Sequence, residues 1–163
     1  MGKKTAVLRH MLSDYLNVGT AEKPEYVLMG TGYKTLDESP GAQTESTKYV
    51  NEKSSSSSVT SYETSFSFEA EHILEEKAID AIYLVGRNHY TGSDAEFEYV
   101  RVELWNKAEG ENEFEARKFI VSCEVSDYGG ENKQTISGNL NAVGDPVLGT
   151  FNTQTRTFTE AAE

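Results

Sequence analysis

The segment Thr60-Ser-Tyr-Glu-Thr-Ser-Phe-Ser-Phe-Glu-Ala70 alternates strictly between two kinds of side chain. The mainly apolar set comprises Tyr62, Thr64, Phe66, Phe68 and Ala70. The polar set comprises Ser61, Glu63, Ser65, Ser67 and Glu69. A period of two predicts a β-strand with one buried face and one solvated face, which is typical of an antiparallel sheet.

Other segments predict strands on both sides of this one. They span residues 14–18, 26–33, 99–105, 118–125 and 135–142. The pair Gly129-Gly130 predicts a hairpin turn between the last two. Phe151 and Phe158 lie among threonines in a tail that predicts one more strand or an extended arm.

Residues 72–85 change to a helical period. The apolar positions Leu74, Ala78, Ala81, Ile82 and Val85 predict one stripe of a helix. Three glutamates lie near its expected start, where the helix dipole favours anions: Glu71, Glu75 and Glu76. Gly86 is expected to supply the left-handed residue that ends the helix.

The segment 34–58 interrupts these patterns. It is polar, it contains the five consecutive serines 54–58, and Leu36 and Val50 are its only aliphatic residues larger than alanine. Such a segment buries too little apolar surface to offset the entropy of ordering itself. We therefore expect a long flexible loop that becomes ordered only against a second copy of the protein.

These elements predict a mainly β fold with a single domain. We expect an antiparallel β-sandwich or partly closed barrel with one flanking α-helix and a long disordered loop. A chain of 163 residues with 37% hydrophobic content is long enough for one core. The predicted division is an N-terminal arm over 1–12, the domain over 13–159 and a C-terminal tail over 160–163.

Composition excludes several classes of function. A net charge of −12 disfavours specific binding to nucleic acid. Cys123 is the only cysteine, so no internal disulfide forms. Residues 1–14 lack the apolar core of a signal peptide, and no apolar run is long enough to cross a bilayer. We expect a soluble protein without a membrane anchor, made in the cytoplasm.

Residues for catalysis or metal binding are sparse. The histidines His10, His72 and His89 have no partner at metal-ligand spacing, so no metal or cofactor is expected. Glu96 and Glu98 share a strand face, and with His89 they define one alternative, a small hydrolase. Trp105 defines another, a carbohydrate-binding β-sandwich that stacks sugars on aromatic rings. The preferred interpretation is that the protein is not an enzyme.

Four segments support that interpretation through a resemblance. They are residues 33–49, Val85-Gly-Arg-Asn-His-Tyr-Thr-Gly92, Glu98-Tyr-Val-Arg-Val-Glu-Leu104 and the most distinctive, Ser137-Gly-Asn-Leu-Asn-Ala-Val-Gly-Asp-Pro146. Together they resemble the major tail tube proteins of long-tailed bacteriophages with non-contractile tails. The resemblance runs from about Tyr15 to Thr159, nearly the whole chain.

The resemblance implies a structural subunit of the virion tail. Its copies would form stacked hexameric rings around a channel for genome delivery, assembled in the bacterial cytoplasm. Other partners would be tail proteins such as the tape measure and terminator proteins, with DNA only in transit. The resemblance implies no catalytic residues.

Two sets of residues follow as site predictions. Contacts between subunits are expected from the loop residues Tyr33, Leu36, Asp37, Pro40, Gly41, Thr47, Tyr49 and Val50. A DNA conduit needs a wall poor in Lys and Arg. The polar set of the 60–70 strand meets that need, so Ser61, Glu63, Ser65, Ser67 and Glu69 are candidates to line the channel. The outer surface is the alternative place for this face.

Overall fold

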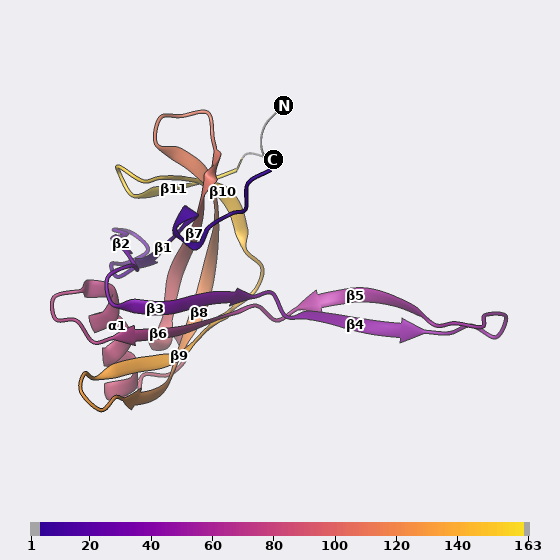
Figure 1. The fold of residues 1–163 in the computed structure, drawn as a ribbon, viewed down its shortest axis with the longest axis horizontal. Coiled ribbons are helices and arrows are strands. Elements are labelled where there is room, and N and C mark those ends of the chain that lie inside the picture. The colour runs from indigo at the N-terminus through magenta and orange to yellow at the C-terminus, as the bar shows by residue number, and fades with distance from the viewer. Residues whose placement is uncertain (1–3, 162–163) are drawn as a thin grey trace.

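The computed structural model describes residues 4–161, which form a curled antiparallel sheet, one helix and a protruding two-stranded ribbon (Figure 1). The main sheet has the order β2-β1-β7-β8-β9-β6-β3, and β10 pairs with both β8 and β11. Its strands are β1 (Leu12–Asn17), β2 (Tyr26–Leu28), β3 (Tyr33–Ser39), β6 (Ser65–Glu71), β7 (Glu96–Lys107), β8 (Glu113–Gly129), β9 (Thr135–Ala142), β10 (Val147–Asn152) and β11 (Thr157–Glu160). The ribbon consists of β4 (Ala42–Thr47) and β5 (Ser56–Tyr62), and the helix is α1 (Lys77–Arg87).

This architecture confirms the predicted fold class, a mainly β antiparallel fold with one flanking helix. The sheet curls into an open half-barrel, and short 3-10 turns at Arg9–Met11 and Gly92–Ala95 precede β1 and β7. Tail residues 157–160 form a strand, β11. The predicted arm and tail extend into residues 1–3 and 162–163, which lie outside the described part of the chain.

Two hydrophobic cores lie on opposite faces of β7. Tyr99 enters the larger core, where Ile79, Ile82 and Val85 of α1 join buried residues of β6, β8 and β9. Val100 and Val102 enter a smaller core with Tyr15, Tyr26 and Phe151. Strand β7 is therefore buried on both faces over residues 99–102, although its alternation predicts only one buried face.

The helix begins and ends later than the sequence predicts. Glu75 has a φ of 72°, which is incompatible with a helix, and the first turn starts only after Glu76. Leu74 consequently lies in a loop with 79% of its surface exposed. Gly86 lies inside α1, and the left-handed residue beyond the helix is His89, with a φ of 54°. Sequence periodicity did not reveal this backbone reversal at Glu75.

The prediction of one disordered loop over 34–58 is wrong for the structure described here. Residues 33–39 are the edge strand β3, which pairs with β6. Residues 42–47 and 56–62 pair with each other as the ribbon, and the amide of Glu52 donates to the carbonyl of Tyr49 in the connecting turn, at 3.0 Å. Pairing between β4 and β5 satisfies the backbone groups on their inner edges, so the strand pattern arises here without apolar side chains to bury.

The predicted strand 60–70 is divided between two sheets. Residues up to Tyr62 belong to the ribbon, and residues from Ser65 belong to the main sheet between β3 and β9. At the junction the amide of Glu63 donates to the carbonyl of Gly41, at 2.9 Å, and the hydroxyl of Thr64 donates to the carbonyl of Pro40, at 3.1 Å. Side chains alternate along both parts of the segment. Those of β5 are exposed on both faces, whereas those of β6 are buried on one face.

Candidate functional site

The ribbon is the most exposed element of the molecule. Every residue of β4 and β5 is exposed, and the ribbon extends from the body along the longest axis of the molecule (Figure 1). At about 3.3 Å per residue, the distance from Gly41 to Val50 is about 30 Å. An isolated two-stranded ribbon is marginally stable in water, and this one packs on no other strand of the described residues.

The predicted contact residues occupy different environments along this region. Leu36 is buried in the core and Tyr33 is half-buried, so neither belongs to a free loop. Asp37 lies on the solvated face of β3, and Pro40 and Gly41 connect β3 to the ribbon. The remaining three are exposed at the far end of the ribbon: Thr47, Tyr49 and Val50.

A second candidate surface is the polar face of the main sheet. Strand pairing places side chains from β3, β6, β9 and β8 in three rows of four: Ser39, Ser65, Asn141 and Ser122; Asp37, Ser67, Asn139 and Glu124; Thr35, Glu69, Ser137 and Asp127. We call these twelve residues the polar wall. They lie on the sheet face opposite Phe66 and Phe68, and they include four carboxylates and neither Lys nor Arg.

Strand pairing brings together three of the five predicted channel residues. Ser65, Ser67 and Glu69 are neighbours on β6 in the polar wall. Ser61 lies on β5 in the ribbon, and Glu63 lies at the junction between ribbon and sheet. Alternate positions of the 135–142 strand place Ser137, Asn139 and Asn141 on one face, and the register of the structure aligns this face with that of β6.

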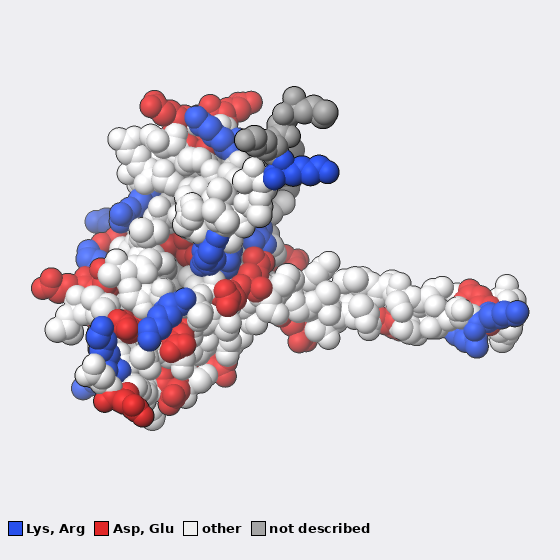
Figure 2. Space-filling model, viewed as in Figure 1, with Lys and Arg blue, Asp and Glu red and all other residues white. Residues whose placement is uncertain are grey.

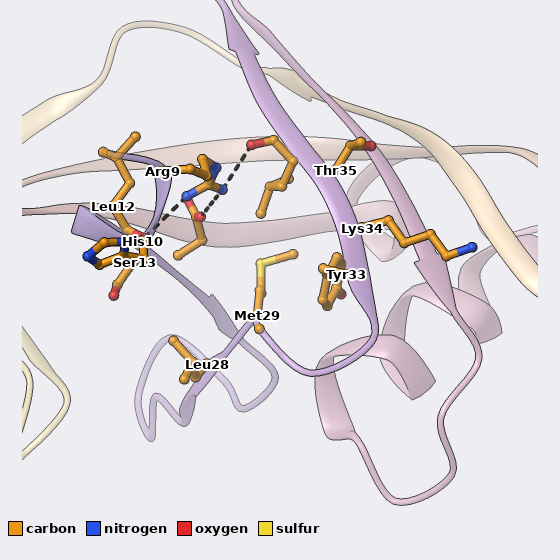
Figure 3. Close-up of a pocket in the computed structure, with 12 residues that line it drawn as sticks. Arg9, His10, Leu12, Ser13, Leu28, Met29, Tyr33, Lys34 and Thr35 are labelled. Carbon is orange, nitrogen blue, oxygen red and sulfur yellow. Dashed lines mark hydrogen bonds and ion pairs between the residues drawn. The ribbon is translucent and has the colours of Figure 1, made fainter. Parts of the chain in front are cut away.

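The open side of the half-barrel is bounded by β3 and by the N-terminal segment. A cleft of about 630 Å³ separates them, with Leu12, Leu28, Met29 and Leu36 among its lining residues (Figure 3). The guanidinium of Arg9 crosses this cleft, donating to Asp14 at 2.9 Å and to the carbonyl of Leu36 at 3.0 Å. Since β3 ends the strand order, its outer edge has no partner strand among residues 4–161.

An ion network lies behind this cleft. Arg117 donates two hydrogen bonds to Glu38, and the Nε of Arg101 lies 3.8 Å from both Glu38 and Asp14. The hydroxyl of Tyr99 donates to Asp14, and burial together with that carboxylate keeps the pKa of Tyr99 well above its usual range. The hydrogen bonds to Glu38 raise the pKa of Arg117. This network joins β3 to the paired strands β1, β7 and β8, with which β3 has no strand pairing.

The residues of the hydrolase alternative are separated in space. His89 lines a cleft with Glu124 and Asp127, whereas Glu96 and Glu98 line another with Asn17. The carboxylate of Glu98 accepts hydrogen bonds from Asn17 at 3.2 Å and from Tyr26 at 2.9 Å, so it serves the packing of β1 and β2. Trp105, the residue of the sugar-binding alternative, is partly exposed towards the end of β7.

Two features are absent from residues 4–161. No group of three or more His, Cys, Asp or Glu side chains within that range is arranged to hold a metal ion. Within the same range, no helix has the length and apolar character needed to cross a membrane.

The fold has a counterpart among solved structures. It is similar to a chain in the cryo-EM structure of the anti-feeding prophage (AFP) baseplate, 6-fold symmetrised, with a TM-score of 0.50 and 11% sequence identity. The match covers 90% of this chain and 97% of that chain. At this identity the likeness shows a shared fold, which therefore occurs in a prophage baseplate. No family model matches the chain, and neither does the sequence of any curated protein.

Proposed function

We propose that this protein is a structural subunit of a phage tail tube, whose copies form stacked rings of six around a channel for the genome. The observation that carries the proposal is the ribbon, which extends about 30 Å from the body with both strands exposed. Tyr62, Val59 and Tyr49 are among its exposed side chains. A second copy supplies the surface that would cover them.

The polar wall supplies the chemistry expected of a channel. Its four carboxylates repel phosphates, and its serine, threonine and asparagine side chains offer no positive charge to hold DNA. Two cations at its margin, Lys34 and Lys133, lie 3.6 and 3.7 Å from the carboxylate of Glu71. DNA would therefore pass the wall without specific binding.

The unpaired edge of β3 supplies the means of closing a ring. A free edge seven residues long is a template for pairing with another chain, and isolated proteins normally protect such edges. Pairing between copies would continue the polar wall from one subunit to the next. The partly apolar cleft beside β3 would be covered in the same contact.

The similarity in fold supports the proposed place of the protein in a phage tail. A chain of the same fold belongs to a prophage baseplate structure that was symmetrised six-fold, in agreement with rings of six. In this proposal the protein acts in the virion tail after assembly in the bacterial cytoplasm. Its partners are its own copies and other tail proteins, such as the tape measure and terminator proteins, and it has no catalytic role and no cofactor.

The experiment replaces residues 42–62 with an Asn-Gly turn. Gly41 and Glu63 already share a hydrogen bond of 2.9 Å, so the turn closes the junction without straining β3 or β6. We expect the variant to melt within a few degrees of the wild type and to remain monomeric. Electron microscopy and sedimentation at increasing concentration should show rings or tubes for the wild type only.

The matched control is Ser57→Ala, which changes one exposed side chain on β5 and should assemble normally. Tubes formed without the ribbon would remove it from the mechanism. A wild type that stays monomeric at every concentration, and binds a sugar through Trp105, would replace the proposal with the carbohydrate-binding alternative.

A further inference from the structure

The far end of the ribbon combines apolar and basic side chains. Val50 is fully exposed at 107% and Tyr49 at 63%. The carboxylate of Glu52 accepts a hydrogen bond from the backbone amide of Tyr49, at 3.4 Å, so this acid serves the turn itself. Within the described part of the chain, Lys48 and Lys53 make no ion pair. We call residues 48–53 the ribbon tip.

A loop of opposite charge lies between β6 and α1. It contains Leu74, which is 79% exposed, followed by Glu75 and Glu76. Neither glutamate makes an ion pair with any residue of the described range. The positive φ of Glu75 is unusual for a residue with a side chain, and it accompanies the exposure of Leu74. We call residues 74–76 the acidic loop.

The ribbon tip and the acidic loop lie at opposite ends of the longest axis of the molecule (Figure 1). Strand β6 spans the body between them, because it begins beside the ribbon and ends beside the acidic loop. One chain cannot bring its own tip to its own loop. Copies arranged head to tail along this axis can do so, and a contact of that kind repeats without closing on itself.

We propose that the ribbon tip of one copy docks on the acidic loop of a second copy, placing Tyr49 and Val50 against Leu74 and the two lysines beside Glu75 and Glu76. Apolar surface meets apolar surface, and each uncompensated charge meets one of opposite sign. Figure 2 shows Lys and Arg side chains gathered at the end of the ribbon, beside an acidic group. This inference rests on the proposed function and names the contact between successive rings.

Cysteine cross-linking tests the contact. In the double variant Val50→Cys/Leu74→Cys, each chain carries one thiol at the tip and one at the loop. Copper phenanthroline in air oxidises pairs of neighbouring thiols to disulfides, with oxygen as the electron acceptor. We expect a ladder of covalent multimers on non-reducing gels. Both positions are highly exposed, so neither change removes a core contact, and the native Cys123 is buried.

The matched control moves the second thiol to another exposed leucine. The variant Val50→Cys/Leu148→Cys carries its second thiol on β10, where Leu148 is 62% exposed. We expect this control, and the single variant Val50→Cys, to stop at dimers. If the wild type forms tubes but Val50→Cys/Leu74→Cys gives no ladder, this inference alone is overturned. A wild type that never assembles would overturn the proposed function together with it.

Charge exchange provides a second test that needs no cross-link. Lys48→Glu/Lys53→Glu should raise the concentration at which tubes appear by at least about tenfold. Adding Glu75→Lys/Glu76→Lys to the same chain should restore assembly. The acidic turn after β7 serves as the control, because Glu109→Lys/Glu111→Lys should restore nothing. If Glu109→Lys/Glu111→Lys restored assembly, the ribbon tip would dock on the turn after β7 and not on the acidic loop, which would overturn the inference.

Discussion

Arg117 and Glu38 form a two-point ion pair, although 79 residues of sequence separate them. Nη1 of Arg117 donates to one carboxylate oxygen at 2.9 Å, and Nη2 donates to the other at 2.6 Å. The pair ties β8, in the middle of the sheet, to β3 at its free edge. Arg101 lies 3.8 Å from the same carboxylate. The open side of the half-barrel is therefore held by charges where it lacks strand pairing.

Replacing Glu38 should destabilise the monomer. Glu38→Ala leaves Arg117 and the buried Arg101 without this counter-charge, and breaking one side of a buried pair costs about 3 kcal/mol. We expect the free energy of unfolding in urea to fall by roughly that amount. Glu45→Ala on the exposed β4 is the matched control and should change the free energy by less than about 0.5 kcal/mol. Equal effects at the two positions would contradict this role for Glu38.

Phe66 and Tyr62 test the division of the 60–70 segment. Phe66 is fully buried, with its ring centroid 4.7 Å from that of Tyr99 and 4.9 Å from that of Phe119. Phe66→Ala should lower the free energy of unfolding by about 3–5 kcal/mol. Tyr62→Ala should change it by less than about 0.5 kcal/mol, because Tyr62 is exposed on the ribbon. Thermal unfolding of the two variants measures the contrast, and a large loss in Tyr62→Ala would mean that the ribbon packs on the body.

The same two residues show what the sequence can predict. Both occupy the apolar phase of one alternation, and the period correctly predicted strand structure, with one buried and one solvated face in β6 only. The period does not show which strand faces are covered by other elements of the same chain. Burial of Phe66 depends on α1 and β8, whereas the face of Tyr62 meets solvent. The ribbon was missed for the same reason, since its polar strands carry no burial signal.

The candidate site was partly predictable. Alternation identified Ser65, Ser67 and Glu69 as one polar face. The rest of the polar wall depends on register between strands that are distant in sequence, such as Ser67 opposite Asp37 on one side and Asn139 on the other. Residues at the junction, such as Glu63, were assigned to the same face because a break between two sheets leaves the alternation unchanged.

Gly86 should resist substitution for a reason unrelated to helix capping. A Cβ at this position would lie 2.1 Å from the hydroxyl oxygen of Tyr128 and 3.0 Å from Cβ of Val125. Gly86→Ala should therefore lower the free energy of unfolding by about 1 kcal/mol, even though alanine favours helices. Tyr128→Phe removes the closest atom, so the double variant should lose less than the sum of the single changes. Additive losses in this double-mutant cycle would exclude the contact as the cause.

Stability should fall at alkaline pH. Burial raises the pKa of the Cys123 thiol to about 12 and raises the pKa values of Tyr26, Tyr33 and Tyr99 above their ordinary value of 10.0. Each group keeps its proton in the folded state at a pH where the unfolded chain releases it. The unfolded state then binds fewer protons, so the free energy of unfolding decreases as the pH rises above about 9.

Tyr33→Phe isolates one contribution to this decrease. The hydroxyl of Tyr33 is buried without a hydrogen-bond partner in the described residues, so its removal should cost little at pH 7. Above pH 10 the variant should lose stability less steeply than the wild type, by up to about 1.4 kcal/mol per pH unit. Urea unfolding between pH 7 and 11 measures both slopes. An unchanged slope would show that Tyr33 ionises equally in both states.

The polar wall can be tested by reversing its charge in intact particles. Ser67→Lys/Glu69→Lys places two cations per subunit on β6 without touching the apolar face, so assembly should be normal. If the wall lines the channel, these cations attract DNA phosphates and slow genome release by at least about tenfold at low salt. The delay should shrink at high salt, because exposed charges are then screened. Release is followed by the fluorescence of a DNA-binding dye, with Glu63→Lys at the ribbon junction as the matched control. Release at the wild-type rate from particles that carry the wall variant would place this face on the outside of the tube.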